Sequence, residues 1–342
     1  MLRRRHVAWL APLAAAVVAG GVVAGISLGG SSAKTTPTVP VVPQSAQSYQ
    51  DALHLVVKAV SPSVVQIQTS TGLGSGVVFD SDGHIVTNAH VVGSAKSFIV
   101  TTLTGKQYKA SLVGAFPADD LAVIKVSGAK LKPAVFADSS KLEVGDIAMA
   151  IGNPLGLRSS VTDGIVSALR GPVPEGNGNT LPSVVQTSAA INPGNSGGAL
   201  ADIQGRVIGV PTLALVDPQM GGAAPGIGFA IPSNLVKDIA GQLVKYGKVV
   251  NSHRAFLGVR VGDTGGQGVY VGAVTPSGPA AKAGMKPGDV IVSVATRPTP
   301  TVDLLGAVLA GLKPRQTVSI AVRRQEGGKA TLHVKLGTLP GG

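Results

Sequence analysis

The chain has 342 residues, of which 44% are hydrophobic and only 3% aromatic, and 47 are glycine. It contains no cysteine, which excludes disulfide bonds, thiolate metal sites and a cysteine nucleophile. The formal net charge is +12, but the basic residues outside the N-terminus are scattered and few aromatic side chains could stack on bases, so we expect no nucleic-acid binding.

The first 30 residues have the pattern of an export signal. Arg3, Arg4 and Arg5 precede an essentially uncharged stretch from Val7 to Gly30, and about 20 apolar residues suffice to span a bilayer. We therefore predict a signal anchor at 1–30, a transmembrane helix with its N-terminus in the cytoplasm and the remaining chain outside. The alternative is a secreted protein, with the signal cleaved after Ser31-Ser32-Ala33. Residues 31–48 are rich in Ser, Thr and Pro and predict a linker that acts as a tether.

Short β-branched runs separated by Gly, Asp and Asn turns fill residues 49–250. Many short strands with such turns are typical of a β-barrel or a β-sandwich. Near the end of this region Ser233 is a predicted helix N-cap and Gly247 a predicted helix stop, so one helix closes the domain. The clearest predicted strands are Val64–Gln68, Gly76–Phe79, His84–Thr87, Ser97–Val100, Leu121–Val126, Ile147–Ile151 and Val207–Pro211.

A second β-rich domain is predicted at 255–338, after a change of domain at 248–254. It contains a predicted helix at 301–312. The apolar residues that recur on one side of that helix are Leu304, Leu305, Val308 and Leu312.

The glycine-rich segment 194–198 carries the strongest chemical signal in the chain. Ser196 lies between Asn195 and two glycines, so its hydroxyl can be exposed on a tight turn. Such a hydroxyl becomes a nucleophile when a base takes its proton and a third group orients that base. The backbone N–H groups of Gly194 and Ser196 are the natural oxyanion-hole donors, and Asn195 shapes the turn between them.

The same glycine-serine pattern occurs in the nucleophile elbow of α/β-hydrolases. That fold needs a helix directly after the serine and a catalytic histidine further along the chain. Here a strand pattern at Arg206–Val210 follows instead, and the only later histidines, His253 and His333, lie at or beyond the domain boundary. The sequence therefore argues against an α/β-hydrolase.

Six histidines compete for the role of base, and the pattern favours His90. It is flanked by the apolar strand Ile85-Val86-Thr87 and by Val91-Val92, as a half-buried histidine beside a core would be. His84 follows the turn Asp82-Gly83, and we expect its ring to face solvent.

Asp119 and Asp120 are the candidates for the acid that orients the base. If both lie on a strand, Asp120 shares its face with the apolar residues Ala122, Ile124 and Val126, whereas Asp119 shares its face with Lys125. An acid that is buried against a histidine belongs on the apolar face. This parity selects Asp120 and predicts that Asp119 is an exposed turn residue.

Three blocks around these residues resemble the signatures of the HtrA (DegP/DegS-like) serine proteases. They are Val86-Thr87-Asn88-Ala89-His90-Val91-Val92, Asp120-Leu121-Ala122-Val123-Ile124-Lys125 and Asn192-Pro193-Gly194-Asn195-Ser196-Gly197-Gly198-Ala199-Leu200. The resemblance runs from about residue 50 to 335. It implies a mainly β fold, a chymotrypsin-like double β-barrel followed by a PDZ domain, with His90 as general base, Asp120 as its orienting acid and Ser196 as nucleophile. It also implies a homo-oligomer, a trimer.

In chymotrypsin-like enzymes the segment six residues before the serine lies at the base of the substrate pocket. Here Ala190 occupies that position and Ile191 follows, so no acid is present to bind Lys or Arg. The resemblance therefore predicts cleavage after small aliphatic residues.

Phe256-Leu257-Gly258-Val259 resembles the carboxylate-binding loop of PDZ domains in this family. Successive backbone N–H groups there can hold a C-terminal carboxylate, while the adjacent strand pairs with an extended peptide and the helix at 301–312 forms the other wall. The resemblance further suggests that loop 170–182 senses peptide binding and that loop 212–225 is its partner beside the pocket.

The leading hypothesis is an extracytoplasmic serine endopeptidase that cleaves unfolded or misfolded proteins and is regulated by C-terminal peptides at its PDZ domain. One alternative is a chaperone-like peptide-binding protein, which captures exposed termini with little cleavage. Another is a regulatory protease with one dedicated membrane-signalling substrate. No motif predicts a metal or an organic cofactor.

Overall fold

The computed structural model describes residues 44–70, 72–153, 160–174, 180–192, 194–217 and 222–341. The chain divides into two compact units, residues 1–43 and 44–342, and the described residues all belong to the second. The predicted anchor at 1–30, and the predicted tether up to residue 43, lie outside the described residues. In the described part of the chain, no helix combines the length and the apolar character needed to cross a bilayer.

The first described element is the helix α1 (Gln44–Val60). Its first five residues were assigned to the tether, and this assignment is wrong for residues 44–48. Val56 and Val60, four residues apart on one face of the helix, are buried in the protein core, so the C-terminal end of the helix is packed against the barrels. The N-terminal half of the helix is polar and largely exposed.

Six antiparallel strands close into a first β-barrel in the order β1-β2-β3-β6-β5-β4. A core of aliphatic side chains that includes Ile67, Ile85 and Ile124 fills its interior. A short helix, α2 (Ala89–Val92), follows β3 directly. The strands are β1 (Val64–Gln68), β2 (Leu73–Val78), β3 (His84–Thr87), β4 (Ser97–Thr101), β5 (Gln107–Phe116) and β6 (Leu121–Val126).

A second closed barrel follows, with the strand order β11-β14-β13-β12-β7-β8. Ala148, Val166, Leu200 and Ile208 belong to its core. The strands are β7 (Ile147–Gly152), β8 (Ser160–Arg170), β11 (Val184–Thr187), β12 (Ala199–Ala201), β13 (Val207–Asp217) and β14 (Gly222–Pro232), and the short strands β9 (Val173–Pro174) and β10 (Thr180–Leu181) pair with each other.

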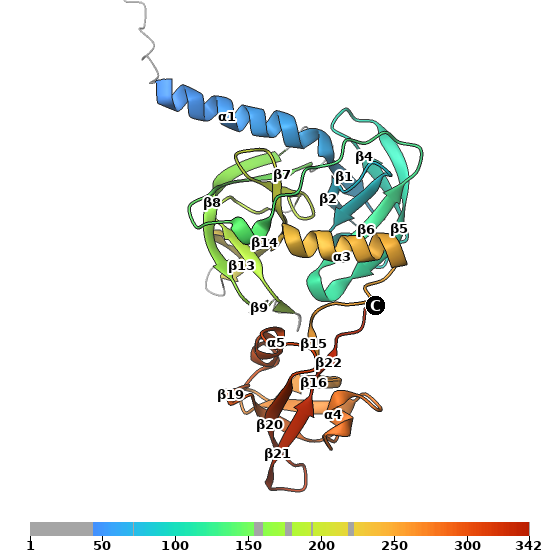
Figure 1. Ribbon diagram of the computed structural model, residues 1–342, viewed down its shortest axis with the longest axis vertical. Helices are drawn as coiled ribbons and strands as arrows, with labels where there is room; N and C mark the ends of the chain where they lie inside the picture. Colours follow the sequence, from blue (N-terminus) through green and yellow to red (C-terminus); the bar gives the residue numbers. More distant parts are fainter. Residues whose placement is uncertain are drawn as a thin grey trace, which may run out of the picture. The chain divides into compact units, whose positions relative to one another are not determined.

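Helix α3 (Ser233–Tyr246) contacts strands of both barrels (Figure 1). Its buried side chains, Val236, Ile239 and Leu243 among them, join one core with apolar residues from each barrel. Gly247 ends the helix with a positive φ of 70°, as predicted. The shared core fixes one barrel against the other, which matters because each barrel supplies part of the site described below.

Ser233 does not cap α3 as predicted. It is the first residue of the helix, after Pro232, and its hydroxyl donates a hydrogen bond to the carbonyl of Ala137 instead. The side chain therefore links the helix to the segment that precedes the second barrel.

The C-terminal part of the chain, from β15 to β22 and called the C-terminal unit below, contains a sheet in the order β16-β17-β18-β20-β21. In this sheet β19 also pairs with β18, and two helices accompany it. Thr301 caps α5 by accepting a hydrogen bond from the N–H of Leu304. Leu305 and Val308 are buried, but Leu304 is 46% exposed and so does not lie on the buried face as predicted. The elements are β15 (Ala255–Phe256), β16 (Val259–Asp263), β17 (Val269–Val274), α4 (Pro279–Lys282), β18 (Val290–Val294), β19 (Arg297–Pro298), α5 (Val302–Ala310), β20 (Thr317–Arg323), β21 (Lys329–Lys335) and β22 (Gly337–Thr338), the last of which pairs with β15. The predicted mainly β architecture, a double barrel followed by a smaller β unit, is confirmed.

Candidate active site

His90 lies on α2, just after β3, and hydrogen bonds join its segment to Asp120, the residue that precedes β6. The backbone N–H of Ala89 and the side-chain amide of Asn88 both donate to the carbonyl oxygen of Asp120, each at 3.1 Å. Two hydrogen bonds from neighbouring residues to one carbonyl fix the position of α2 relative to Asp120.

The Asp120 carboxylate then holds His90 itself. Its Oδ1 accepts the backbone N–H of His90 at 3.0 Å, and its Oδ2 lies 2.8 Å from the ring Nδ1. Asp120 is buried while the His90 side chain is 48% exposed. Because a carboxylate only accepts hydrogen bonds, the ring proton is directed to Nδ1, and Nε2 is the nitrogen with basic character.

Asp120 lies in a turn, whereas the argument from strand parity placed it on a strand. It follows the 3₁₀ turn Pro117–Asp119 and has a left-handed backbone, with φ of 50°, before β6 begins at Leu121. The left-handed region is uncommon for non-glycine residues but is tolerated by aspartate. The selected residue is the one that contacts His90, whereas the alternation argument behind its selection does not apply to a residue outside the strand.

Thr212, on β13 of the second barrel, links this pair to Ser196. Its hydroxyl donates to Asp120 Oδ2 at 2.5 Å, and its carbonyl accepts the hydroxyl of Ser196 at 3.3 Å. One residue thus connects the three predicted site residues in a chain of hydrogen bonds. The sequence analysis missed Thr212, whose only signal is a hydroxyl side chain among the mostly apolar residues of its strand.

The turn that carries Ser196 is closely packed against its neighbours. Gly194 and Gly197 have φ of 112° and 79°, and a Cβ on Gly197 would collide with the carbonyl of Ser75. Glycine is therefore required at position 197 by both conformation and space. The N–H of Asn195 donates to the carbonyl of Asn192 at 3.0 Å, so Asn195 shapes the turn from within.

The two predicted pocket residues differ in their surroundings. Ala190 is exposed, and its carbonyl accepts hydrogen bonds from Thr162 Oγ1 at 2.7 Å and from Asn195 Nδ2 at 3.2 Å. Ile191 is buried in the core of the second barrel, where a Cβ on Gly228 would collide with it. Of the two, only Ala190 is exposed.

His84 does not face solvent as predicted. Its side chain is 12% exposed and its Nδ1 lies 2.7 Å from Asp80 Oδ2, while Lys125 Nζ lies 3.2 Å from its Nε2. The ring packs against β6 because His84 pairs directly with Lys125 across the sheet.

Asp119 is also not the exposed turn residue that was predicted, since its side chain is completely buried. Burial raises the pKa of Asp119 to about 6, although the nearby Arg254 charge opposes this. Arg254 lies 2.9 Å from Asp119 Oδ1 and also donates to the carbonyls of Ala118 and Thr180. This arginine precedes the C-terminal unit and joins it to the turn beside Asp120.

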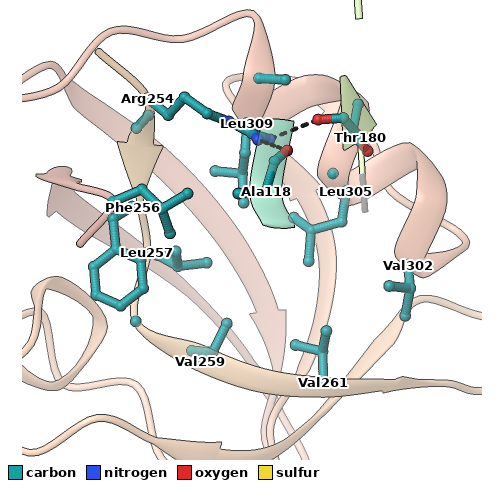
Figure 2. A pocket seen from close by; sticks show the side chains of 15 residues that line it. Ala118, Thr180, Arg254, Phe256, Leu257, Val259, Val261, Val302, Leu305 and Leu309 are labelled. Carbon is teal, nitrogen blue, oxygen red and sulfur yellow. Dashed lines mark hydrogen bonds between the residues drawn. The ribbon is translucent and has the colours of Figure 1, made fainter. Parts of the chain in front are cut away.

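The predicted carboxylate-binding loop lines a cavity of about 270 Å³. Figure 2 shows Phe256, Leu257, Val259 and Val261 on one side of this cavity and three side chains of α5 on the other. Ala118, Thr180 and Arg254 also line it, and the α5 side chains are Val302, Leu305 and Leu309. The strand and helix walls that the sequence predicted are both present.

Several predicted features fall partly outside the described residues. In the predicted sensor loop 170–182, residues 175–179 are not among those described. In its predicted partner at 212–225, the same is true of residues 218–221. Within the described ranges, no three or more His, Asp or Glu side chains gather in a way that could hold a metal ion.

Comparison with known families identifies two domains. Residues 74–210 match the trypsin-like peptidase domain and residues 255–336 match the PDZ domain. The first match contains His90, Asp120 and Ser196, and the second contains the cavity-lining loop 256–259.

Curated relatives of the chain are named as serine proteases. The chain is 38% identical to the serine protease PepD of Mycobacterium tuberculosis, over 92% of this chain and 71% of the relative. It is 39% identical to the periplasmic serine endoprotease DegP of Escherichia coli K12, over 79% of this chain but only 58% of that longer protein.

Solved structures agree with this assignment. The HtrA-type protease AlgW with decapeptide aligns with a TM-score of 0.59 and 31% identity, over 83% of this chain and 98% of that one. The serine endoprotease from Yersinia pestis aligns with a TM-score of 0.58 and 33% identity, over 88% and 100%.

Proposed function

Because the chain belongs to the HtrA family of serine proteases, we propose that His90, Asp120 and Ser196 form the catalytic triad of an endopeptidase. The observation that carries the proposal is the chain of hydrogen bonds that runs from His90 through Asp120 and Thr212 to Ser196. Each barrel contributes to it, and the shared core holds the barrels together.

The proposed reaction gives each of these three residues one role. Ser196 attacks the substrate carbonyl while His90 Nε2 accepts its proton, and Asp120 stabilises the imidazolium that forms. The backbone N–H groups of Gly194 and Ser196 stabilise the negative oxygen of the tetrahedral intermediate. Asn195 holds the turn between these two donors, because its own N–H is bonded to Asn192.

The proposed preference is for a small aliphatic residue before the cleaved bond. The exposed Ala190 offers a small, uncharged surface, and its carbonyl is held by two side chains. No carboxylate lies at this position or at the next one to bind a basic residue. Ile191 contributes through the core behind the pocket rather than by contact with substrate.

The proposed regulator is a peptide with an apolar C-terminus, bound between β16 and α5. Backbone N–H groups of the loop from Phe256 to Val259 would hold its carboxylate, and the cavity would take its last side chain. One of the similar solved structures is the HtrA-type protease AlgW with decapeptide. Arg254 lines the cavity and contacts Asp119, so the groove is physically connected to the residue next to Asp120.

The proposed setting is outside the cytoplasm, as for the periplasmic relative DegP. The basic and then apolar residues 3–30 support a membrane anchor, and family membership supports a trimer that cleaves unfolded or misfolded proteins. A chaperone-like binding protein and a protease with one dedicated substrate remain the alternatives that the experiment must separate.

The test is degradation of an unfolded model protein by the purified full-length chain, with Ser196→Ala as its matched control. We expect cleavage that Ser196→Ala abolishes and that added peptides with apolar C-termini stimulate. Peptide binding without cleavage of the unfolded protein would contradict the general protease and favour a binding protein or a dedicated protease. Cleavage that survives Ser196→Ala would contradict the proposed nucleophile.

A further inference from the structure

Ser75 is a buried hydroxyl residue of the first barrel that lies directly against the turn carrying Ser196. It belongs to β2 and none of its surface is exposed. Its hydroxyl donates to the carbonyl of Gly194 at 2.5 Å and accepts the backbone N–H of Asn153 at 2.8 Å. Its backbone N–H donates to the carbonyl of Ser196 at 3.0 Å.

These hydrogen bonds fix the peptide planes on either side of Asn195-Ser196. The plane between Gly194 and Asn195 is held by Ser75 at its carbonyl and by Asn192 at its N–H. The plane between Ser196 and Gly197 is held by Ser75 at its carbonyl, while its N–H donates to the carbonyl of Pro211. A peptide plane that is bonded at both ends cannot rotate without breaking a hydrogen bond in a buried place.

The direction of the oxyanion donors depends on these two planes. The N–H of Ser196 belongs to the plane between them, and the N–H of Gly194 is joined to the first of them through the φ and ψ angles of Gly194. Catalysis requires such donors to point at the position of the oxyanion before the reaction begins. We infer that Ser75 is a positioning residue that fixes the oxyanion turn of Gly194 to Ser196 from the opposite barrel.

Ser75 also accepts a hydrogen bond from the strand that leads to His90. Thr87, at the end of β3, donates its hydroxyl to the carbonyl of Ser75 at 2.6 Å. Three residues later the chain reaches His90. The inference rests on the proposed function, because a residue positions an oxyanion turn only where Ser196 is the nucleophile.

The test compares Ser75→Ala with Ser233→Ala in the full-length protein. Both serines are completely buried and both donate to a backbone carbonyl, but Ser233 bonds Ala137, outside the catalytic segments. Loss of a direct oxyanion donor lowers kcat by about 10²- to 10³-fold. For Ser75→Ala we expect a fall in kcat of about 10- to 100-fold with little change in KM, and for Ser233→Ala a kcat within about twofold of wild type.

A second readout separates positioning from general destabilisation. A peptide boronate forms a tetrahedral adduct that uses the oxyanion hole, so its affinity should fall in Ser75→Ala by about the same factor as kcat. The affinity for the matched uncleaved peptide should stay unchanged. Ser75→Cys keeps the shape of the side chain and a weaker hydrogen-bond donor, so its kcat should lie between those of the wild type and Ser75→Ala. If the alanine variant does not fold, the comparison is made with Ser75→Cys instead.

Two outcomes overturn the inference. One is a kcat for Ser75→Ala within twofold of wild type, and the other is an equal loss of substrate and boronate binding. Ser196→Ala, measured in parallel, keeps the two proposals apart. If it abolishes cleavage while Ser75→Ala is fully active, only the role of Ser75 is wrong, and if it leaves cleavage intact, the proposed function is wrong.

Discussion

Two histidine–aspartate pairs lie at opposite ends of the same short segment, and their local geometry is nearly identical. In each, one carboxylate oxygen accepts the backbone N–H of the histidine, at 3.1 Å for Asp80 and His84 and at 3.0 Å for Asp120 and His90. In each, the other oxygen lies within hydrogen-bond distance of Nδ1, at 2.7 Å and 2.8 Å.

The surroundings of the two pairs are opposite. His84 has a ring that is 12% exposed and is contacted by Lys125 at Nε2, while Asp80 is 30% exposed. His90 has a ring that is 48% exposed, while Asp120 is buried and bonded to Thr212 of the other barrel. A short histidine–aspartate distance is thus common to a structural pair and a candidate catalytic pair. The difference lies in what the second barrel adds.

The largest expected effect tests this contrast directly. His90→Gln should lower kcat/KM for peptide cleavage by at least about 10⁴-fold, because the base that activates Ser196 is lost. His84→Gln should leave kcat/KM within about threefold of wild type, with a modest fall in the free energy of unfolding on the order of 1 kcal/mol. Both variants would be measured by steady-state kinetics and by chemical denaturation. Comparable losses of activity in the two variants would show that the pairs are not distinct.

A smaller effect is expected at the contact that distinguishes the Asp120 pair. Thr212→Val keeps the shape and the backbone carbonyl that accepts the Ser196 hydroxyl, but it removes the donor to Asp120 Oδ2. A hydrogen bond to a charged group contributes about 1.5–3 kcal/mol, so a fall in kcat on the order of tenfold is expected.

The matched control for that variant is Thr101→Val. Thr101 is also a buried threonine, and its hydroxyl has no hydrogen-bond partner among the described residues. Its replacement should leave kcat unchanged. A kcat for Thr212→Val equal to that of this control would mean that the contact from the second barrel does not support the Asp120 pair.

The sequence was informative where a residue's role depends on its immediate neighbours. The strand His84–Thr87 and the strand Leu121–Val126 have the predicted bounds, and the glycines around Ser196 indicate a tight turn because no larger residue fits there. These features arise from local conformation and alternation, which a short window of sequence contains.

The sequence was misleading where a distant partner decides the outcome. Asp119 is buried because Arg254, 135 residues further along, reaches it, and the adjacent Asp-Asp pair gives no sign of that contact. His84 is largely shielded from solvent because β6 places Lys125 beside it, although a turn precedes the histidine. Thr212 joins two site residues from a strand with no motif. Burial that depends on chain segments brought together by the fold cannot be predicted from local polarity.

Asp119 provides the third test, which concerns stability rather than activity, since it is a buried carboxyl paired with an arginine rather than a histidine. Its pKa is raised from 3.8 to about 6 by burial, so the folded protein holds the proton to higher pH than the unfolded chain does. Below about pH 4 both states are protonated at Asp119 and its burial carries no ionisation penalty. As the pH rises from about 4 to about 6, the unfolded chain ionises first, and the free energy of unfolding falls.

Asp119→Asn removes this ionisation. The free energy of unfolding of the wild type, measured relative to Asp119→Asn by denaturant titration, should therefore decline between about pH 4 and about pH 6, by an amount on the order of 1–3 kcal/mol, and stay constant above that range. Because the Arg254 charge lowers the pKa of Asp119, Arg254→Gln should extend the decline to higher pH. A relative stability that rises with pH over this range would mean that pairing outweighs burial at Asp119. In that case the two neighbouring aspartates, one held by a histidine and one by an arginine, would both be stable as carboxylates.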